Sequence, residues 1–144
     1  MDKRISVRPA EIRDASEIGR LITELGYPTS GTDMEARLAV LLPHPDHLTN
    51  VALADDHIVA MIGTGIAHYY EKNGRYARIL ALVVDGKYRG HGIGSMLVRE
   101  TERRLRERGV GAVIVNSGSH RKGAHGFYLS LAYAETGVRF VKSL

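Results

Sequence analysis

Apolar residues recur along the chain at two spacings, and each spacing predicts a different kind of element. Alternating or continuous apolar runs bounded by turn residues predict strands, here over 4–10, 48–55, 57–70, 76–84, 111–117 and 137–144. Apolar residues three and four apart predict helices, here from Asp14 to Gly26, from Thr32 to just before Pro43, from Gly92 to Gly109, and over 121–133. The combination indicates a mixed α/β fold.

Single residues refine the ends of the first two helices. Asp14 with Glu17 fits the pattern in which a polar residue caps a helix start and an acid three residues later bonds back. Thr32 with Glu35 repeats that pattern. Gly26 is the residue type that commonly ends a helix, because glycine adopts the left-handed conformation without a side-chain clash. We therefore expect the first helix to end at Gly26.

The middle of the chain predicts a β-α-β unit. Gly63 and Gly65 indicate a bulge or a close backbone approach within 57–70. The segments 76–84 and 111–117 are nearly all apolar, which is typical of strands buried on both faces. Because a long helix joins them, we expect these two strands to be parallel, with a right-handed crossover. Opposite charges four apart stabilise the outside of that helix, in the pairs Glu100–Arg104, Glu102–Arg106 and Arg103–Glu107.

Composition limits the classes of function. The 144 residues are 44% hydrophobic and 25% charged, as in a soluble protein with one domain, here residues 1–144. No apolar run approaches the roughly 20 residues of a membrane span, and the opening MDKRISVRPAEI lacks the apolar stretch of a signal peptide. We therefore expect a cytoplasmic protein without a membrane partner.

Charge and cysteine content narrow the chemistry further. The net charge of +4 comes from charges mixed along the chain, whereas nucleic-acid binders more often show a basic stripe with aromatic residues. We therefore expect no nucleic-acid partner, although a small polyanionic ligand suits the excess. The chain has no cysteine, which excludes disulfides, thiolate metal sites and a cysteine nucleophile.

One loop carries a specific chemical signal. In VVDGKYRGHGIGSML, residues 83–97, glycine occupies positions 90, 92 and 94 directly before the long helix. A helix start presents unpaired N–H groups and about half a positive charge, which together bind anions. Glycine lets a diphosphate approach the backbone, Arg89 can fork onto phosphate oxygens, and Ser95 can donate a hydroxyl. On this pattern alone, a purely steric role for the glycines stays open.

Two nucleotide-binding motifs fit this loop poorly. A P-loop ends in Gly-Lys-Ser/Thr, but here Gly94 is followed by Ser95 and Met96. A dinucleotide fingerprint lies in the first β-α unit and is followed, about 20 residues later, by an acid that ends the next strand. This loop lies past the midpoint of the chain, and its next strand ends in Asn116–Ser117.

A third pattern fits well. The stretch VVDGKYRGHGIGSMLVRETERRLRERG, residues 83–109, resembles the acetyl-coenzyme A signature of the GNAT superfamily of N-acetyltransferases, V-x-P-x-Y-R-G-x-G-I-G-x-x-L followed by an amphipathic helix. AHGFYLSLAY (124–133) resembles the family's A-x-x-F-Y-x-x-x-G-F/Y segment, and residues 5–28 resemble its first strand and helix. The resemblance implies a central mixed, mostly antiparallel sheet of six to seven strands flanked by about four helices.

The resemblance also implies where acetyl-CoA binds. The diphosphate would lie on the backbone of Arg89, Gly90, His91, Gly92, Ile93, Gly94 and Ser95, and the pantetheine arm would pair like an extra strand with Leu82, Val83 and Val84. Asn116 would hydrogen-bond the pantetheine amides, unless it is a simple turn residue. Arg121 stands where relatives often carry a cofactor-contacting asparagine, and it would reach the phosphates or lie on the surface. Gly86 replaces the family's proline, which leaves the loop more flexible without removing binding.

For the reaction, the resemblance implies direct attack of an amine on the thioester, without an acyl-enzyme and without a metal. Tyr128 aligns with the tyrosine that donates a proton to the departing thiolate; on sequence alone, a Phe-Tyr pair on a helix is more often core. Many relatives place a glutamate on the strand before the loop as general base, but residues 79–82 are Ile, Leu, Ala and Leu. The base is therefore open, with Glu71, Glu135, His68, His125 or a water chain as candidates.

The acceptor site is implied to lie between the loop after the first helix and the strands that face the cofactor. The candidate residues are Tyr27, Tyr69, Tyr70 and Glu71, since aromatic and acidic groups suit a cationic amine. We expect a small-molecule primary amine, with a protein lysine or N-terminus as the alternative. A non-catalytic acyl-CoA sensor is the second hypothesis, because the strand carboxylate is absent. Relatives are often homodimers, but no feature of the sequence decides this.

Overall fold

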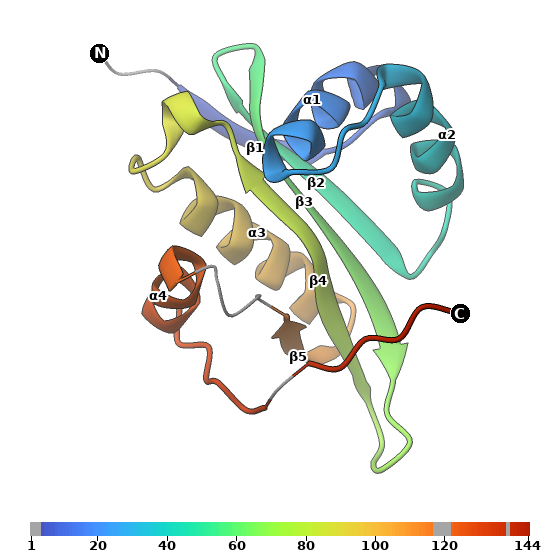
Figure 1. Ribbon diagram of the computed structural model, residues 1–144. Coiled ribbons are helices and arrows are strands. Elements are labelled where there is room, and N and C mark those ends of the chain that lie inside the picture. The colour runs from blue at the N-terminus through green and yellow to red at the C-terminus, as the bar shows by residue number, and fades with distance from the viewer. Residues whose placement is uncertain (1–3, 117–121, 138) are drawn as a thin grey trace. The chain divides into compact units, whose positions relative to one another are not determined.

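The structure is a computed structural model that describes residues 4–116, 122–137 and 139–144 (Figure 1). Its strands are β1 (Ile5–Pro9), β2 (His47–Ala54), β3 (His57–His68), β4 (Arg75–Val84) and β5 (Val110–Val115). Its α-helices are α1 (Ala15–Leu25), α2 (Gly31–Leu41), α3 (Ile93–Glu107) and α4 (Lys122–Ser130), and short 3₁₀ turns are η1 (Ile12–Asp14) and η2 (Gly86–Tyr88). The chain divides into two compact units, Met1–Ile114 and Val115–Leu144. The single domain expected from chain length stays a prediction.

The strands form one sheet in the order β1-β2-β3-β4-β5. The first four are consecutive antiparallel neighbours. β5 follows α3 and begins beside the start of β4, where a Cβ built on Gly111 would lie 3.9 Å from the carbonyl oxygen of Arg75. Figure 1 shows β4 and β5 running in the same direction, as expected for the β-α-β unit. The mixed, mostly antiparallel sheet is therefore confirmed.

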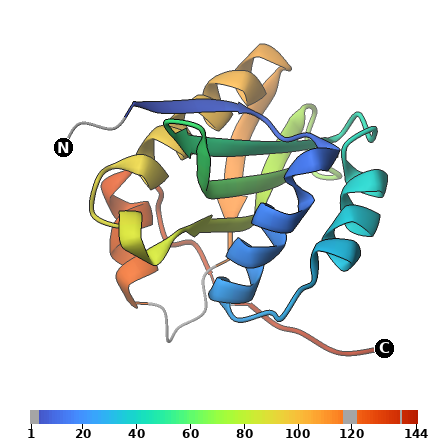
Figure 2. The same ribbon diagram turned by 90° about the horizontal axis from the view of Figure 1, so that it is seen from above.

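Helices cover both faces of this sheet within the first unit: α1 and α2 lie on one side and α3 on the other (Figures 1 and 2). The larger core joins buried residues of α1 and α2, such as Ile18, Leu21 and Leu38, to Val51 and Met61 of the sheet. A smaller cluster buries Leu105 of α3 against Leu48, Ala77 and Val110. Alternation along β2 sends successive side chains to the two faces.

A buried polar contact fixes α3 against the sheet. Asn50 of β2 is 1% exposed, and its amide donates to Thr101 Oγ1 at 3.1 Å. Its carbonyl oxygen accepts from Arg104 Nη1 at 2.6 Å. Both polar ends of the buried amide are therefore satisfied by the same helix, as buried polar groups require.

The predicted bulge is present, with its extra residue on the neighbouring strand. Gly63 pairs with Ala81 and Thr64 pairs with Ile79, so Leu80 of β4 has no opposite residue. The two glycines of β3 mark the right place in the ladder. The sequence of a single strand does not tell which of two partners carries an unpaired residue.

Two predicted helix starts are wrong in detail. α2 begins at Gly31 with Ser30 as its cap, whose hydroxyl accepts from the Asp33 N–H at 3.0 Å. Asp14 precedes α1 but makes no side-chain cap, because its carboxylate accepts from the Arg8 guanidinium and the Glu11 N–H instead. The predicted end of α1 is confirmed, since Gly26 has φ +119°.

Three strand predictions are also wrong. β3 ends at His68 rather than residue 70. The strands β4 and β5 are not buried on both faces: Leu80 is 56% exposed, and among described β5 residues only Val110 is buried. The described residues 137 and 139–144 form no strand, so the sheet has five strands over the described residues. An apolar run becomes a strand only where a neighbouring strand pairs with it, and Phe140 there is 90% exposed.

Candidate anion-binding site at the start of α3

The loop between β4 and α3 depends on two glycines for its shape. Gly90 has φ +80° and Gly92 has φ +78°, in the left-handed region that other residues rarely adopt. A Cβ built on either glycine would meet nothing within 4 Å. Their requirement for glycine is therefore conformational, and the space in front of both residues is open.

The loop ends in a helix start that no side chain caps. Gly92 is the N-cap of α3 and makes no side-chain cap bond, and the N–H of Met96 is bonded to the carbonyl of Gly92 at 3.0 Å. The preceding N–H groups, of Ile93, Gly94 and Ser95, belong to the first turn, which has no intrahelical acceptor. Together with the positive end of a helix of 15 residues, they provide the donors that an anion needs.

Three basic side chains, Lys87, Arg89 and His91, lie on the exposed surface of the loop. Arg89 Nε donates to the carbonyl of Val84 at 3.2 Å, and its Nη2 lies 3.7 Å from Glu24 Oε1. His91 Nδ1 lies 2.9 Å from the carbonyl oxygen of Arg89 and 3.1 Å from that of Tyr88. Carbonyl oxygens only accept, so Nδ1 carries the proton and Nε2 is the acceptor in the neutral ring.

Helix α1 holds the beginning of the loop through two side chains one turn apart. Arg20 Nη1 donates to Asp85 Oδ2 at 2.9 Å, and Arg20 Nη2 donates to the carbonyl of Ile58 at 3.2 Å. Asp85 Oδ1 accepts from the Lys87 N–H at 3.0 Å. This backbone hydrogen bond, with the Arg20 guanidinium, lowers the pKa of Asp85, although partial burial opposes the shift. Glu24 Oε1 accepts from the Gly86 N–H at 2.6 Å.

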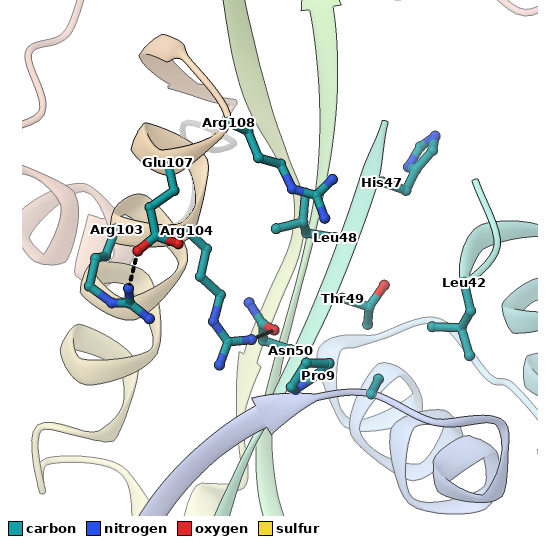
Figure 3. Close-up of a pocket in the computed structure, with 11 residues that line it drawn as sticks. Pro9, Leu42, His47, Leu48, Thr49, Asn50, Arg103, Arg104, Glu107 and Arg108 are labelled. Atoms are coloured by element: carbon teal, nitrogen blue, oxygen red, sulfur yellow. Dashed lines mark hydrogen bonds and ion pairs between the residues drawn. The ribbon is translucent and has the colours of Figure 1, made fainter. Parts of the chain in front are cut away.

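An open groove of about 1000 Å³ lies beside the helix start. Gly92 and Met96 border it, and it extends along α3 past Arg99 to Ile5, Ser6 and Val7 of β1. A second cavity, of about 450 Å³, lies between β2 and the other end of α3 (Figure 3). There Arg103 pairs with Glu107, Arg104 with Asn50, and Arg108 donates to the carbonyl of Pro45. That cavity includes no residue of the loop.

The residues implied to hold the pantetheine arm form the end of β4 next to this loop. Val83 is 3% exposed and pairs with Met61, and Val84 pairs with Ala60. Leu82 pairs with Ile62. These three residues therefore continue directly into the glycine-rich loop, with one backbone edge engaged by β3.

The residues expected around the acceptor are not brought together. Tyr27 follows α1, three residues after Glu24, and is 60% exposed. Tyr69, Tyr70 and Glu71 lie in the β3–β4 hairpin, beyond the His68–Arg75 pair. The glycine-rich loop follows the other end of that ladder, where Val84 pairs with Ala60. Figures 1 and 2 both show the hairpin tip away from the loop after α1.

Within the hairpin, Tyr69 has partners of its own. Its ring centroid lies 4.9 Å from that of Tyr76, and the Lys72 ammonium lies 4.5 Å above the Tyr69 ring. Tyr70 is fully exposed. Two candidates for the general base, His68 and Glu71, belong to the same end of the sheet.

Other sequence-predicted residues lie in the second unit. Tyr128 is on α4, with ring centroids 5.2 Å from Phe127 and 5.6 Å from Tyr133. The chain turns back after α4, so that the Tyr133 N–H donates to the carbonyl of Tyr128 at 3.0 Å. Asn116, His125 and Glu135 also belong to this unit, and Arg121 lies outside the described residues.

Sequence reasoning missed the support from α1. Arg20 and Glu24 are four residues apart on the polar side of that helix, and nothing in their spacing identifies partners 65 and 62 residues away. One residue of the loop does hint at this support. Gly86 has a backbone N–H that can donate a hydrogen bond, whereas the proline of the family pattern has none. Leu80, the unpaired residue of β4, was missed because its apolar neighbours fit a regular strand.

Comparisons with known proteins agree with this architecture. Residues 16–133 match the model of the acetyltransferase (GNAT) family. An aminoalkylphosphonate N-acetyltransferase of Salmonella typhimurium is 29% identical over 141 residues, which cover 96% of this chain and 90% of that protein. A GNAT family acetyltransferase of Staphylococcus aureus superposes with a TM-score of 0.84 at 27% identity, covering 97% of this chain and 98% of that one. Glucosamine-6-phosphate N-acetyltransferase of Arabidopsis thaliana, at 21% identity, shares the fold with a TM-score of 0.82 and coverage of 98% and 99%.

Proposed function

The chain belongs to the acetyltransferase (GNAT) family and is an acyltransferase, and from this premise we propose that it transfers an acetyl group from acetyl-CoA to a primary amine on a small molecule. One observation carries the proposal. Gly90 and Gly92, with φ +80° and +78°, open an uncapped helix start to an anion. A diphosphate matches that site in charge and in its need for several N–H donors.

The chain's own residues supply binding and orientation. We assign the diphosphate to the backbone of residues 89–95, with Arg89 as the cation that forks onto its oxygens. The backbone edge of Leu82–Val84 that does not pair with β3 would pair with the pantetheine arm, which directs the thioester along β4. Asn116 and Arg121 are proposed as further cofactor contacts.

In the proposed reaction the amine lone pair attacks the thioester carbonyl, so that a C–N bond forms and the C–S bond breaks. Tyr128 donates its phenolic proton to the departing thiolate. A phenol with a pKa near 10 is protonated at neutral pH and suits this role. The acetyl group passes directly to the amine, and the chain has no cysteine on which it could be held.

The amine must lose a proton before it attacks, since an alkylammonium with a pKa of about 10.4 has no lone pair. The β4 segment Ile79–Leu82 carries no carboxylate for this step. Glu71, His68, Glu135, His125 and a chain of water molecules are the alternatives for this proton transfer. Because the first two lie at the hairpin end of β4, their participation requires an acceptor that reaches that end.

A small-molecule acceptor is supported by the relative from Salmonella typhimurium, which by its name acetylates aminoalkylphosphonates. Tyr27, Tyr69, Tyr70 and Glu71 stay proposals for acceptor contacts. Tyr27 and the β3–β4 hairpin lie apart, so Tyr27 would contact a different part of an acceptor from the hairpin residues. A protein lysine or N-terminus is the alternative acceptor, and a cytoplasmic location, a homodimer and the absence of a nucleic-acid partner stay predictions.

A non-catalytic acyl-CoA sensor is the second candidate function. The observation that favours it is the absence of a carboxylate on Ile79–Leu82. A sensor would bind acetyl-CoA through the same helix start but would not consume it.

An amine panel with acetyl-CoA tests the proposal directly. We expect at least one small primary amine to release coenzyme A, detected by a thiol reagent that meets no cysteine in the protein. Tyr128→Phe should lower kcat about 10²-fold or more, the usual scale for a general acid, while the Kd for coenzyme A stays within about twofold, a change of about 0.4 kcal/mol.

The same panel identifies the alternatives. If acetyl-CoA binds tightly and no amine releases thiol, the sensor is correct. If only peptides with a lysine or a free N-terminus react, the protein-directed alternative replaces the small-molecule acceptor.

A further inference from the structure

One carboxylate of α1 contacts both the backbone and the arginine of the anion-binding loop. Glu24 Oε1 accepts a hydrogen bond from the Gly86 N–H at 2.6 Å, and the same oxygen lies 3.7 Å from Arg89 Nη2. The Glu24 side chain is 32% exposed and that of Arg89 is 62% exposed. The short hydrogen bond is charge-assisted, which makes it the stronger of the two contacts.

The neighbouring contacts fix the first half of the loop to α1. Arg20, one turn before Glu24, engages Asp85, and Asp85 also accepts from the Lys87 N–H. Beyond Gly86, the glycines at 90 and 92 adopt left-handed conformations with open space around them. We therefore expect the conformation of the glycine-rich half to depend on how firmly the first half is fixed to α1.

Gly86 stands where the family pattern has proline, and the backbone there would accept one. Asp85, the residue before it, has φ −50° and ψ +132°, and this ψ lies in the extended range that a residue before proline adopts. Gly86 is the first residue of η2, a position at which proline is favoured. Two features oppose proline: it has no N–H to donate to Glu24, and a Cβ at this position would lie 2.9 Å from Glu24 Oε1.

We propose that Glu24 is a positioning residue for cofactor binding, and that its hydrogen bond to Gly86 fixes the loop in place of the rigid ring of a proline. The same carboxylate holds the Arg89 guanidinium beside the loop. This inference rests on the proposed function, because its effect on affinity requires that coenzyme A bind at this loop. Glu24 does not touch the reacting atoms in this account.

Five variants and the wild type test the proposal by titration calorimetry with coenzyme A. Glu24→Ala removes both contacts, and we expect its Kd to rise about tenfold, which corresponds to the loss of one ordinary to charge-assisted hydrogen bond. Glu24→Gln keeps a carbonyl oxygen for the Gly86 N–H and should stay within about threefold of wild type. Glu35→Ala removes the same charge from an exposed position of α2 and should leave the Kd unchanged.

The fourth change separates rigidity from charge. Gly86→Pro in the wild-type background should weaken binding, because the ring displaces Glu24 and removes its donor. In the Glu24→Ala background the same proline should restore affinity to within about threefold of wild type, since the obstruction is gone and φ is fixed.

Hydrogen exchange of the Gly86 amide is a readout that needs no ligand. We expect this amide to be protected in wild type and Glu24→Gln and to exchange faster in Glu24→Ala. If wild type fails to bind coenzyme A, the proposed function is wrong whatever the exchange result. If wild type binds but Glu24→Ala binds equally well, or both Glu24 variants bind more tightly because a negative charge was removed, the positioning role is overturned.

Discussion

At the scale of single residues, backbone conformation matters more than side-chain chemistry in the candidate site. Gly90 and Gly92 are required by positive φ angles, and no neighbouring atom within 4 Å would oppose a Cβ at either. The glycines therefore have two consequences at once. They permit the loop's path, and they leave its N–H groups uncovered at the start of α3.

Alanine at Gly90 or Gly92 tests that double role. Each substitution should lower the free energy of unfolding by about 1–2 kcal/mol, the cost of a left-handed conformation for a residue with a Cβ. Each should also raise the Kd for coenzyme A about tenfold, because the backbone relaxes away from the strained conformation and displaces the N–H donors. A tenfold change in Kd corresponds to about 1.4 kcal/mol of binding free energy. Urea unfolding and titration calorimetry measure the two effects separately.

Gly109 offers a matched control. It has φ +77°, and it lies at the other end of α3, where a Cβ would approach Arg75 no closer than 3.8 Å. Gly109→Ala should cause a similar loss of stability and leave the Kd unchanged. Equal loss of affinity in all three variants would mean that binding follows general stability and not the geometry of the loop.

At the scale of elements, α1 connects the glycine-rich loop to β1. Its C-terminal half engages Asp85 and Gly86, while its start is fixed to β1 through Asp14. Asp14 is 5% exposed and accepts from both terminal nitrogens of Arg8, at 2.7 and 3.0 Å. The hydrogen bond from Arg8 is the largest cause of the lowered pKa of Asp14, and the Glu11 N–H adds to it against the opposing effect of burial.

Asp14→Asn should therefore lower the free energy of unfolding at pH 7 by about 1.5–3 kcal/mol, the range for a hydrogen bond to a charged group. Because the pKa of Asp14 is lower in the folded than in the unfolded chain, its contribution is complete above the unfolded value of about 3.9 and disappears as the pH falls through the folded value. Chemical unfolding at a series of pH values measures both proteins.

The two stability curves should run parallel near neutral pH, begin to converge below about pH 4, where Asp14 of the unfolded chain becomes protonated, and meet only below the lower pKa of the folded state. A constant difference down to the lowest pH would show that the carboxylate's charge does not contribute. A Glu35→Ala control should follow the wild-type curve, because the structure gives that exposed side chain no ion pair among the described residues.

Elements were predictable from the sequence where local periodicity decided them. The spacing predicts one buried face of α3 made of Ile93, Met96, Leu97, Thr101 and Leu105, and all of these except Met96, which is 42% exposed, are buried. The three predicted ion pairs of α3 form. Long-range choices were not predictable. Three features depend on a partner that is distant in sequence. These are the pairing of residues 137–144 with a strand, the position of the bulge at Leu80 or at Gly63, and the choice of Asp14 between capping α1 and binding Arg8.

The site shows the same division. The glycines and the helix start were predicted because the anion-binding chemistry lies within one continuous stretch. The support from Arg20 and Glu24 was not, since it is set by packing of α1 beside η2. Tyr69 and Glu71 follow β3 directly in the sequence. The sequence does not show that the tip of this hairpin and the glycine-rich loop lie at opposite ends of the β3–β4 ladder.

At the scale of the whole molecule, the first unit places helices on both faces of the sheet and leaves the start of α3 at the end of β4. No helix among the described residues is both long and apolar enough to cross a membrane. Tyr128 belongs to the second unit, so the proposed proton donor and the proposed diphosphate site are contributed by different parts of the chain. The backbone assigned to the diphosphate, residues 89–95, belongs to the first unit, and the further cofactor contacts proposed for Asn116 and Arg121 belong to the second.

The most direct test of the account compares coenzyme A with pantetheine, which lacks the 3′-phosphoadenosine diphosphate portion, by titration calorimetry of the wild-type protein. If main-chain donors at the start of α3 bind the diphosphate, coenzyme A should saturate the protein, pantetheine should give no measurable binding at the same concentrations, and Arg89→Ala should weaken coenzyme A binding. Equal affinity for the two compounds, or no affinity for coenzyme A, would contradict it.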